Sequence, residues 1–560
     1  MRDSLRLRTY LAGFATALLA WHLAGVHRWL AQPFATWAGW DEAYIAAFAQ
    51  RMIEGQWLPY VDAVSHRGPV LYWLAALGQW LAGGYSWAAM RHMALLFAEA
   101  NLVLCFAVGV AARRPLAGFV AAATFLFTTA YSMEPKDGIA FNGELVAMPF
   151  VLLGTLLAIV ALRERDPGSE SRVWLTTGAG VLIMLGALSK QPAGLHLLPI
   201  GAWLIATAVH ERSTLGRLDL RPSLGFVVGA VTPALAVAAY FALAGAWRPF
   251  TYYLVTYNRS VYMGPVSLGY ALESSFLFWR DNMPLLFLSL IGVTWAASRF
   301  ASKLDDLRPA AWSSALVHTA VPLTTAMHLL LAIVGAVATF RFWDHYFIPV
   351  LPWFGLLAGL LVESAFSEAT GRLRRTHVLV LVCFVFVSFV LRHLTTLWLD
   401  GARREGRAFL DPTRDPITSY IREHTRDGES VFVWGFAPEL YISARRRPVS
   451  RFVFTTFPAG MVPWFPMLSL EDETRLAVPG ARAALLRELE RERPPLIVDV
   501  PNSMEHRSLR RYEELRRYLD TNYCFERTLF GDNGRIADVY HRRLDDRPCR
   551  STPPPLPKPN

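Results

Sequence analysis

Apolar segments long enough to cross a lipid bilayer recur through the first 398 residues of the chain. A transmembrane helix needs about 20 consecutive apolar residues. Runs of this order occupy 9–30, 88–111, 115–131, 144–162, 173–189, 192–209, 223–244, 283–298, 315–338, 347–365 and 376–398. They predict a polytopic α-helical membrane protein with about eleven spans, within a margin of two and so up to about thirteen. The further apolar run from Pro69 to Gly83 is left unassigned.

The composition agrees with a membrane body joined to a polar domain. Of the 560 residues, 53% are apolar and 18% are charged, against roughly 25% charged in soluble proteins. The 55 Lys and Arg residues give a net charge of +10, yet most fall in short loops or in the C-terminal part, not on one amphipathic face. This excludes a disordered chain and argues against a plain soluble enzyme, and nucleic acid is not an expected partner.

Basic residues are concentrated in alternate loops. With a cytoplasmic N-terminus, the short inside loops contain Arg113 and Arg114; Arg163, Arg165 and Arg172; Arg212, Arg217 and Arg221; Arg299, Lys303 and Arg308; and Arg372, Arg374 and Arg375. The short outside turns hold Lys136, Lys190 and Arg341. By the positive-inside rule, segments 31–87 and 245–282 and everything after about 399 lie outside. We expect a multi-pass protein of the bacterial inner (plasma) membrane with a retained first span.

The chain becomes polar from Asp400 onward. Short β-like runs, Val431 to Trp434, Leu496 to Val500 and Ala537 to Tyr540, alternate with helical patterns at Arg482 to Arg491 and Leu509 to Leu519. A turn cluster at 531–534 suits a terminal hairpin. The predicted organisation is a transmembrane domain at 1–398 with a large outside loop at 31–87, an extracytoplasmic α/β domain at 399–550 and a disordered Pro-rich tail at 551–560.

The four cysteines show no metal-binding spacing, so a zinc site is not expected. Cys524 and Cys549 fall in the segment predicted to be outside, where a disulfide is permitted. However, Cys524 lies in a predicted strand, where it can be a small buried hydrophobe, and Cys549 adjoins the Pro-rich end. Two free thiols are therefore favoured, and a bridge is the alternative.

The first outside loop contains acids, a cation and aromatic residues between apolar segments: Asp41, Glu42, Asp62, His66 and Arg67. Its Trp and Tyr residues favour amphipathic helices at the headgroup layer. A carboxylate there is partly desolvated, which makes Asp41 a candidate general base. The alternatives are a helix N-cap for Asp41, a snorkelling cation for Arg67 and a turn cap for Asp62.

Two further clusters lie at predicted outside turns. Glu144 opens an apolar helix after Asn142-Gly143, either as compensation of the helix dipole or as a functional acid, whereas Glu134 and Asp137 suit loop solvation. Arg341-Phe342-Trp343-Asp344-His345-Tyr346 precedes a late span and suits capture of a lipid phosphate, with an aromatic belt in which Arg341 pairs with Asp344 as the alternative. Lys190 lies between two spans and is open to the same two interpretations, capture of a lipid phosphate or a structural position at the membrane interface.

The order of these features resembles the bacterial members of glycosyltransferase family 39. The features are an apolar span, an Asp-Glu loop, Gly-x-x-x-Pro-Tyr-x-Asp, a basic-Gly-Pro step, Asn-x-Glu after the third span, His-Tyr before a late span and a periplasmic tail. That family belongs to the GT-C superfamily, which includes protein mannosyltransferases and the aminoarabinose transferase of lipid A. The resemblance covers about residues 1–400.

The resemblance implies transfer of a hexosyl or pentosyl group from a polyprenyl phosphate to an acceptor at the extracytoplasmic face, with inversion. Asp41 then matches the first-loop acid that acts as base, Glu144 the second acid, and His345 and Tyr346 the late-span pair. Arg67 stands where relatives often have Lys, which implies a donor-phosphate contact, although Arg binds phosphate as a fork. The remaining substrate-binding candidates are Glu42, Asp62, His66, Lys190 and Arg341.

The expected partners are a polyprenyl-phosphate sugar donor, a lipid, glycan or protein acceptor, and the bilayer. With no Gly-rich phosphate loop and no Asp-x-Asp in an outside loop, neither a nucleotide sugar nor a divalent metal or other cofactor is expected. A transporter or flippase of lipid-linked glycans is the main alternative, and a non-catalytic assembly protein is a third. Transporters usually carry acids near the bilayer midplane, whereas these acids cluster at one face, which favours the enzyme.

Overall fold

The computed structural model describes residues 40–129, 133, 135–164, 166, 168–263, 268–281, 283–303, 317, 319–368, 413–461, 469–504, 507–531, 534–544 and 549. The chain packs as two compact units. One, the membrane unit, consists of 1–29, 94–244 and 266–406; the other, the loop–sheet unit, consists of 30–93, 245–265 and 407–560. Each unit is described by itself.

Apolar helices make up the membrane unit. In the described part of the chain, six segments are long and apolar enough to span a bilayer: α4 (Trp87–Ala111, which begins in the loop–sheet unit), α7 (Gly143–Leu162), α8 (Glu170–Ser189), η2 with α9 (Gln191–His196 and Leu197–Leu215), α10 (Arg221–Leu243) and α15 (Ala320–Val337). Shorter apolar stretches lie in α5 (Pro115–Phe127), α13 (Met283–Ala301) and α16 (Val350–Glu368).

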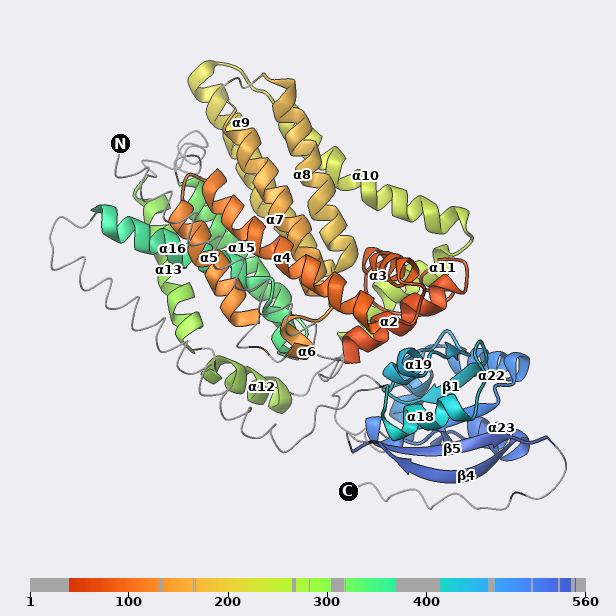
Figure 1. The fold of residues 1–560 in the computed structure, drawn as a ribbon. Helices are drawn as coiled ribbons and strands as arrows, with labels where there is room; N and C mark the ends of the chain where they lie inside the picture. Colours follow the sequence, from red (N-terminus) through yellow and green to blue (C-terminus); the bar gives the residue numbers. More distant parts are fainter. Residues whose placement is uncertain are drawn as a thin grey trace. The chain divides into compact units, whose positions relative to one another are not determined.

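These nine helices fall on nine of the predicted runs, which confirms a polytopic α-helical membrane protein. The predicted runs 9–30 and 376–398 lie outside the described residues, so the count of eleven stays a prediction. The described part of the unit also contains the short elements α6 (Pro135–Gly138), α12 (Leu268–Asp281) and the 3-10 turn η5 (Asp344–Phe347). Helices α7, α8 and α9 run side by side (Figure 1).

Small residues allow the helices of the membrane unit to pack at backbone contact. A Cβ on Gly180 of α8 would meet the backbone of Phe226 in α10, and one on Gly229 would meet the backbone of Thr177. Gly355 and Gly359 of α16 lie in the same way against Ala121 and Ala117 of α5. Without a hydrophobic driving force between helices in lipid, such close van der Waals packing holds membrane helices together.

The loop–sheet unit contains a five-stranded mixed sheet in the order β2-β1-β3-β5-β4. Strands β1 (Ser430–Trp434), β2 (Arg447–Pro448) and β3 (Leu496–Asp499) are parallel, and β4 (Tyr523–Phe530) and β5 (Ile536–Arg542) form an antiparallel hairpin beside β3. The helices of this part are α18 (Pro416–Glu423), α19 (Glu439–Ala444), α20 (Thr456–Ala459), α21 (Leu470–Leu476), α22 (Ala481–Glu492) and α23 (Glu513–Asn522), with 3-10 turns η6 (Pro501–Met504) and η7 (Leu509–Arg511). The predicted α/β fold and terminal hairpin are confirmed.

The same unit includes residues of the first loop that we predict to be outside and of the segment before α12. Helices α2 (Trp40–Ile53) and α3 (Pro69–Leu81) pack on each other, and α2 also packs on α19 and β2. α11 (Trp247–Thr251) and the π-helical turns η3 (Tyr252–Thr256) and η4 (Asn258–Tyr262) follow α10. Parts of all three segments predicted to be outside therefore share one compact unit.

Helix α2 differs from the amphipathic surface helix that we expect from the sequence. Its residues 42–50 are all buried, because α3 and the α/β domain cover it. The unassigned run from Pro69 forms α3, whose 13 residues are fewer than a span requires.

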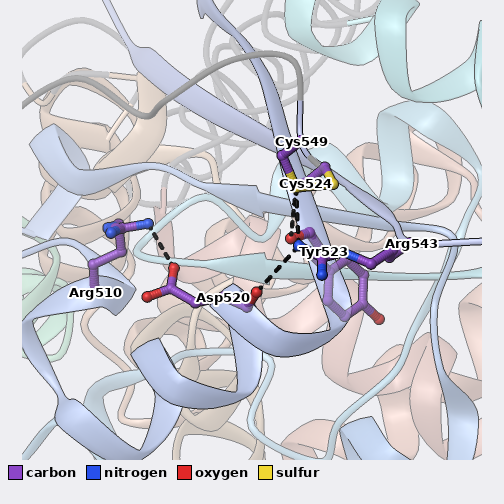
Figure 2. Close-up of a disulfide and its surroundings, with 6 residues drawn as sticks. All are labelled: Arg510, Asp520, Tyr523, Cys524, Arg543 and Cys549. Carbon is purple, nitrogen blue, oxygen red and sulfur yellow. Dashed lines mark hydrogen bonds and ion pairs between the residues drawn. A yellow bond between two sulfur atoms is a disulfide. The ribbon is translucent and has the colours of Figure 1, made fainter. Parts of the chain in front are cut away.

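The expectation of two free thiols is wrong: Cys524 and Cys549 form a disulfide. Figure 2 shows the bridge beside Tyr523, with the Arg543 side chain near both. The two Cα atoms are 5.2 Å apart. Pairing of β4 with β5 places the end of β5 beside the start of β4, where Cys524 lies, and no local sequence pattern places Cys549 there.

Candidate active site

Asp41 and Arg67 form an ion pair in the loop–sheet unit. One guanidinium nitrogen of Arg67 lies 2.5 Å from Oδ1 of Asp41, and the side chains of Arg67 and Asp41 are 8% and 27% exposed, respectively. Helix α2 begins at Trp40, so Asp41 lies in its first turn and is not the N-cap. Arg67 does not snorkel, because its charge is buried and compensated by the carboxylate.

Buried hydroxyl groups fix the backbone that carries Arg67. The Tyr60 hydroxyl donates to the Arg67 carbonyl oxygen at 2.7 Å, and the Arg67 amide donates to Ser65 Oγ at 3.3 Å. Ser65 Oγ and the Tyr72 hydroxyl are 2.5 Å apart. The guanidinium carbon lies 5.6 Å from the ring centroid of Tyr44, in cation–π range. These contacts hold Arg67 in one orientation.

The charge of Arg67 is maintained despite burial. Burial lowers the pKa of Arg67, but the Asp41 carboxylate and neighbouring tyrosines raise it, and the pKa lies well above its ordinary value. Arg67 therefore stays a cation throughout the physiological range. An adjacent guanidinium also stabilises the ionised carboxylate through a charge-assisted hydrogen bond.

The α/β domain contributes directly to the support of this pair. The Phe454 ring stacks on Tyr44 with centroids 4.3 Å apart, and the Val64 amide donates to the Arg451 carbonyl oxygen at 3.1 Å. The Trp87 indole donates to Ser443 Oγ at 3.1 Å. The first loop and the domain more than 350 residues later in sequence thus share one packed structure.

The other predicted residues of the first loop have structural partners. Glu42 is fully buried and pairs with Arg91 at 2.9 Å. Asp62 Oδ2 accepts from the amides of Gln56 and Leu58, which is the turn-capping alternative. The His66 ring stacks on Tyr262 with centroids 4.1 Å apart.

A second cation–carboxylate pair lies in the membrane unit. Lys190 Nζ is 2.8 Å from Glu144 Oε1, with the side chains of Lys190 and Glu144 15% and 4% exposed. The same ammonium lies 4.8 Å from the ring centroid of Tyr346. Asn142 caps α7 by accepting the Leu145 amide at 2.8 Å, so Glu144 sits in the first turn of α7 and also has a charged partner.

His345 of the same unit is paired with Asp137, an acid that its sequence context predicts to be solvated. His345 Nδ1 lies 2.6 Å from Oδ1 of Asp137, and both side chains are largely buried. Arg341 is buried in the segment that leads to η5. The separately predicted residues Glu144, Lys190, His345 and Tyr346 are therefore neighbours within one unit.

Three residues of the site were not predicted from the sequence. They are Arg91, which pairs with Glu42; Asp137, which pairs with His345; and Phe454, which stacks on Tyr44. Asp137 is 208 residues from His345, so no local spacing signals the contact. In the described residues no group of three or more His, Cys, Asp or Glu side chains is placed to hold a metal ion.

Comparison with known proteins identifies the fold. No protein-family profile and no curated protein sequence matches the chain. ArnT from Cupriavidus metallidurans, solved bound to undecaprenyl phosphate, has 13% identity and a TM-score of 0.51 over 94% of this chain and 98% of its own. Its apo form gives 15% identity and the same TM-score of 0.51 over the same shares.

An archaeal protein has the same architecture. AglB from Archaeoglobus fulgidus, an oligosaccharyltransferase in complex with an inhibitory peptide and a dolichol-phosphate, has 11% identity and a TM-score of 0.50 over 96% of this chain and 75% of its own. Identities this low show a shared fold and not a shared reaction. The chain therefore has the GT-C type of fold that the sequence resemblance predicts.

Proposed function

We propose that the chain is a membrane glycosyltransferase that moves a hexosyl or pentosyl group from a polyprenyl phosphate to an acceptor hydroxyl, with inversion, at the extracytoplasmic face of a bacterial inner membrane. The observation that carries the proposal is the Asp41–Arg67 ion pair at the start of α2. In this pair, a carboxylate that can accept a proton lies against a cation that can bind phosphate.

The pairing suggests how base and cation act together. Asp41 takes the proton of the acceptor hydroxyl as the new glycosidic bond forms at the anomeric carbon, and the electron pair of the breaking bond passes to the phosphate oxygen. Protonation neutralises Asp41 and so releases Arg67 from its partner. Arg67 is then available to the phosphate while negative charge grows on it, which is transition-state stabilisation.

Lys190 and Glu144 form a similar cation–carboxylate pair in the membrane unit. A buried ammonium beside a carboxylate is stable without ligand and can be redirected to a phosphate oxygen by a small movement of its flexible stem. We assign Lys190 and Arg341 to substrate binding within the membrane unit and Glu144 to the orientation of Lys190. No cofactor enters this scheme.

The disulfide supports the proposed orientation. Disulfides persist in oxidising compartments and are rare in the cytoplasm, so the Cys524–Cys549 bridge favours an extracytoplasmic loop–sheet unit. The basic residues of alternate loops independently favour the same orientation. Both arguments favour a position for Asp41 on the side where a lipid-linked sugar would meet a surface acceptor.

Purified protein in proteoliposomes, supplied with radiolabelled polyprenyl-phosphate sugar and an extract of envelope acceptors, tests the proposal. Transfer of label to an acceptor with release of polyprenyl phosphate supports the enzyme. Movement of intact labelled donor between leaflets, without bond cleavage, would instead support the flippase. Neither activity with a well-folded protein would favour the non-catalytic alternative.

A further inference from the structure

A histidine pair lies among the helices of the membrane unit. His196, at the end of η2, and His328, in α15, are each 1% exposed, and their Nδ1 atoms are 2.8 Å apart. The Trp353 ring of α16 stacks on His328 with centroids 4.1 Å apart. A hydrogen bond between two Nδ1 atoms requires one ring to donate and the other to accept. Ionisable residues in membrane helices characteristically pair with one another or face a water-filled cavity.

His328 and Trp353 line a cavity within the membrane unit. Its walls come from α4, α5, α7, α9, α15 and α16 and from the loop between α4 and α5. Arg114 of that loop also lines the cavity, and its side chain, which pairs with Glu363, is 50% exposed. The cavity therefore extends from the buried histidine pair to the surface at a basic loop, which the positive-inside rule predicts to be cytoplasmic.

Three of the lining residues carry a buried polar atom that has no hydrogen-bond partner among the residues that the structure describes. These atoms are Thr155 Oγ1 of α7, His328 Nε2 and Trp353 Nε1. Thr155 is 3% exposed, and His328 and Trp353 are each 1% exposed. A polar group that leaves bulk water without gaining another partner destabilises the folded state. Three such groups around one cavity indicate that a ligand in the cavity bonds to them.

The chemistry of these groups and the size of the cavity identify the ligand. The Trp353 indole only donates, the Thr155 hydroxyl donates or accepts, and His328 Nε2 does either, according to which ring of the pair holds the Nδ1 proton. The ligand must therefore both accept and donate. The centre of a water molecule can occupy about 20 Å³ of the cavity, and one bound water molecule requires about 10–15 Å³. An apolar chain in this cavity would leave all three groups unpaired.

We propose that this cavity is an internal water site of the membrane unit, in which water bonds to Thr155, His328 and Trp353 and hydrates the histidine pair from the predicted cytoplasmic end. Water in this site links α7, α15 and α16 through hydrogen bonds. Thr155 lies in the second half of α7, whereas Glu144, the partner of Lys190, lies in its first turn. The water site is therefore separate from the Lys190–Glu144 pair, and the inference does not depend on the proposed transfer reaction.

Hydroxyl-radical labelling of the purified full-length protein in detergent tests the site. X-ray radiolysis generates the radicals from water in place, so a buried side chain is oxidised quickly only where water is bound beside it, and mass spectrometry measures the rate. Trp434 of β1 is the matched control, because it is 0% exposed and its indole donates to the Arg507 carbonyl oxygen at 3.0 Å. Trp353 should be oxidised several-fold faster than Trp434. Equal rates for the two tryptophans would overturn the inference.

Thr155→Val gives an independent test, because valine has a similar shape and lacks the hydroxyl. If water binds Thr155, the variant loses a hydrogen bond, and both the labelling rate of Trp353 and the unfolding midpoint should fall. Thr325→Val is its control, since Thr325 also lines the cavity but its hydroxyl donates to the Val321 carbonyl oxygen at 2.7 Å within α15. This control should leave the labelling of Trp353 unchanged.

A dry cavity predicts the opposite sign for Thr155→Val. The substitution would then remove an unpaired buried hydroxyl and raise the unfolding midpoint. A raised midpoint together with unchanged labelling of Trp353 would therefore overturn the inference.

Discussion

The ring of Phe454, in the α/β domain, stacks on the ring of Tyr44 in helix α2, with centroids 4.3 Å apart. Tyr44 in turn lies beneath the Arg67 guanidinium that pairs with Asp41. The chain of contacts through Phe454, Tyr44, Arg67 and Asp41 gives the α/β domain a role in the candidate site. Phe454 helps to orient a cation that is distant from it in sequence.

Replacement of Phe454 by Ala should therefore lower turnover. Loss of the aromatic pair, worth about 0.5–1.5 kcal/mol beyond burial, lets Tyr44 and Arg67 relax, and we expect kcat to fall about tenfold with only a modest fall in the unfolding midpoint. Steady-state kinetics and thermal unfolding of the purified variant measure both.

Phe525→Ala is the control for that variant. Phe525 is also half-buried and contacts an aromatic partner, Tyr540 at 5.6 Å, but it lies in the terminal hairpin. Its replacement should destabilise the protein similarly and leave kcat unchanged. Equal effects of both substitutions on kcat would refute a specific role for Phe454.

Loss of one partner of the Lys190–Glu144 pair should destabilise the protein more than loss of both. Lys190→Met leaves a carboxylate that is 4% exposed without its cation, and breaking a buried pair costs about 3–5 kcal/mol. The double variant Lys190→Met with Glu144→Gln should recover most of the unfolding midpoint. Arg475→Met, at an exposed pair with Asp472, should cost under about 1 kcal/mol. A double variant as unstable as the single one would contradict this account.

The helices of the membrane unit are predictable from the sequence, because an apolar run of about 20 residues has few alternatives. Strands β1, β3 and β5 are also predictable, from alternating and β-branched runs. The assembly of the loop–sheet unit from separate stretches of the chain is not predictable from the sequence. The packing of α2 against α19 and β2 depends on contacts across hundreds of residues, which a local pattern does not encode.

The candidate site is also only partly predictable from the sequence. Asp41, Arg67, Glu144 and Lys190 are identifiable as charges in apolar surroundings, yet their pairing is not. The polar sequence neighbours of Asp137 predict a solvated acid, whereas its actual partner is on a turn 208 residues away. The sequence also disfavours the Cys524–Cys549 bridge, because Cys549 adjoins the Pro-rich end and no local pattern places it beside Cys524.

The disulfide closes a loop with a sequence separation of 25, which corresponds to about 3 kcal/mol of loop-closure entropy. Replacing both Cys524 and Cys549 by Ser should lower the unfolding midpoint and expose 413–549 to limited proteolysis. Peptide mapping of non-reduced, alkylated protein should find the two cysteines in one linked pair. Two alkylated thiols at these positions would refute the bridge and weaken the orientation argument.

Asp499 predicts a pH dependence of stability. It is fully buried at the end of β3, and burial raises its pKa to about 8, against about 3.9 when unfolded. Between these values the folded state holds a proton that the unfolded state has lost, so stability falls as the pH rises, by about 1.4 kcal/mol per pH unit.

Asp499→Asn should remove this dependence, because the amide does not titrate. Unfolding midpoints between pH 5 and 8 should decline for wild type and for the exposed control Asp520→Asn, and be flatter for Asp499→Asn. Parallel curves for all three proteins would show that Asp499 is not the responsible group.

Single-turnover transfer by Asp41→Asn tests the central claim most directly. Purified wild type, Asp41→Asn and the control Glu54→Gln, which changes an acid just beyond the same helix, are each mixed with radiolabelled polyprenyl-phosphate sugar and acceptor. Loss of a general base costs about 10²- to 10⁴-fold, so Asp41→Asn should lose transfer by that factor while it binds undecaprenyl phosphate at least as tightly as wild type, since Arg67 is released. A rate constant for Asp41→Asn equal to that of wild type would contradict the account.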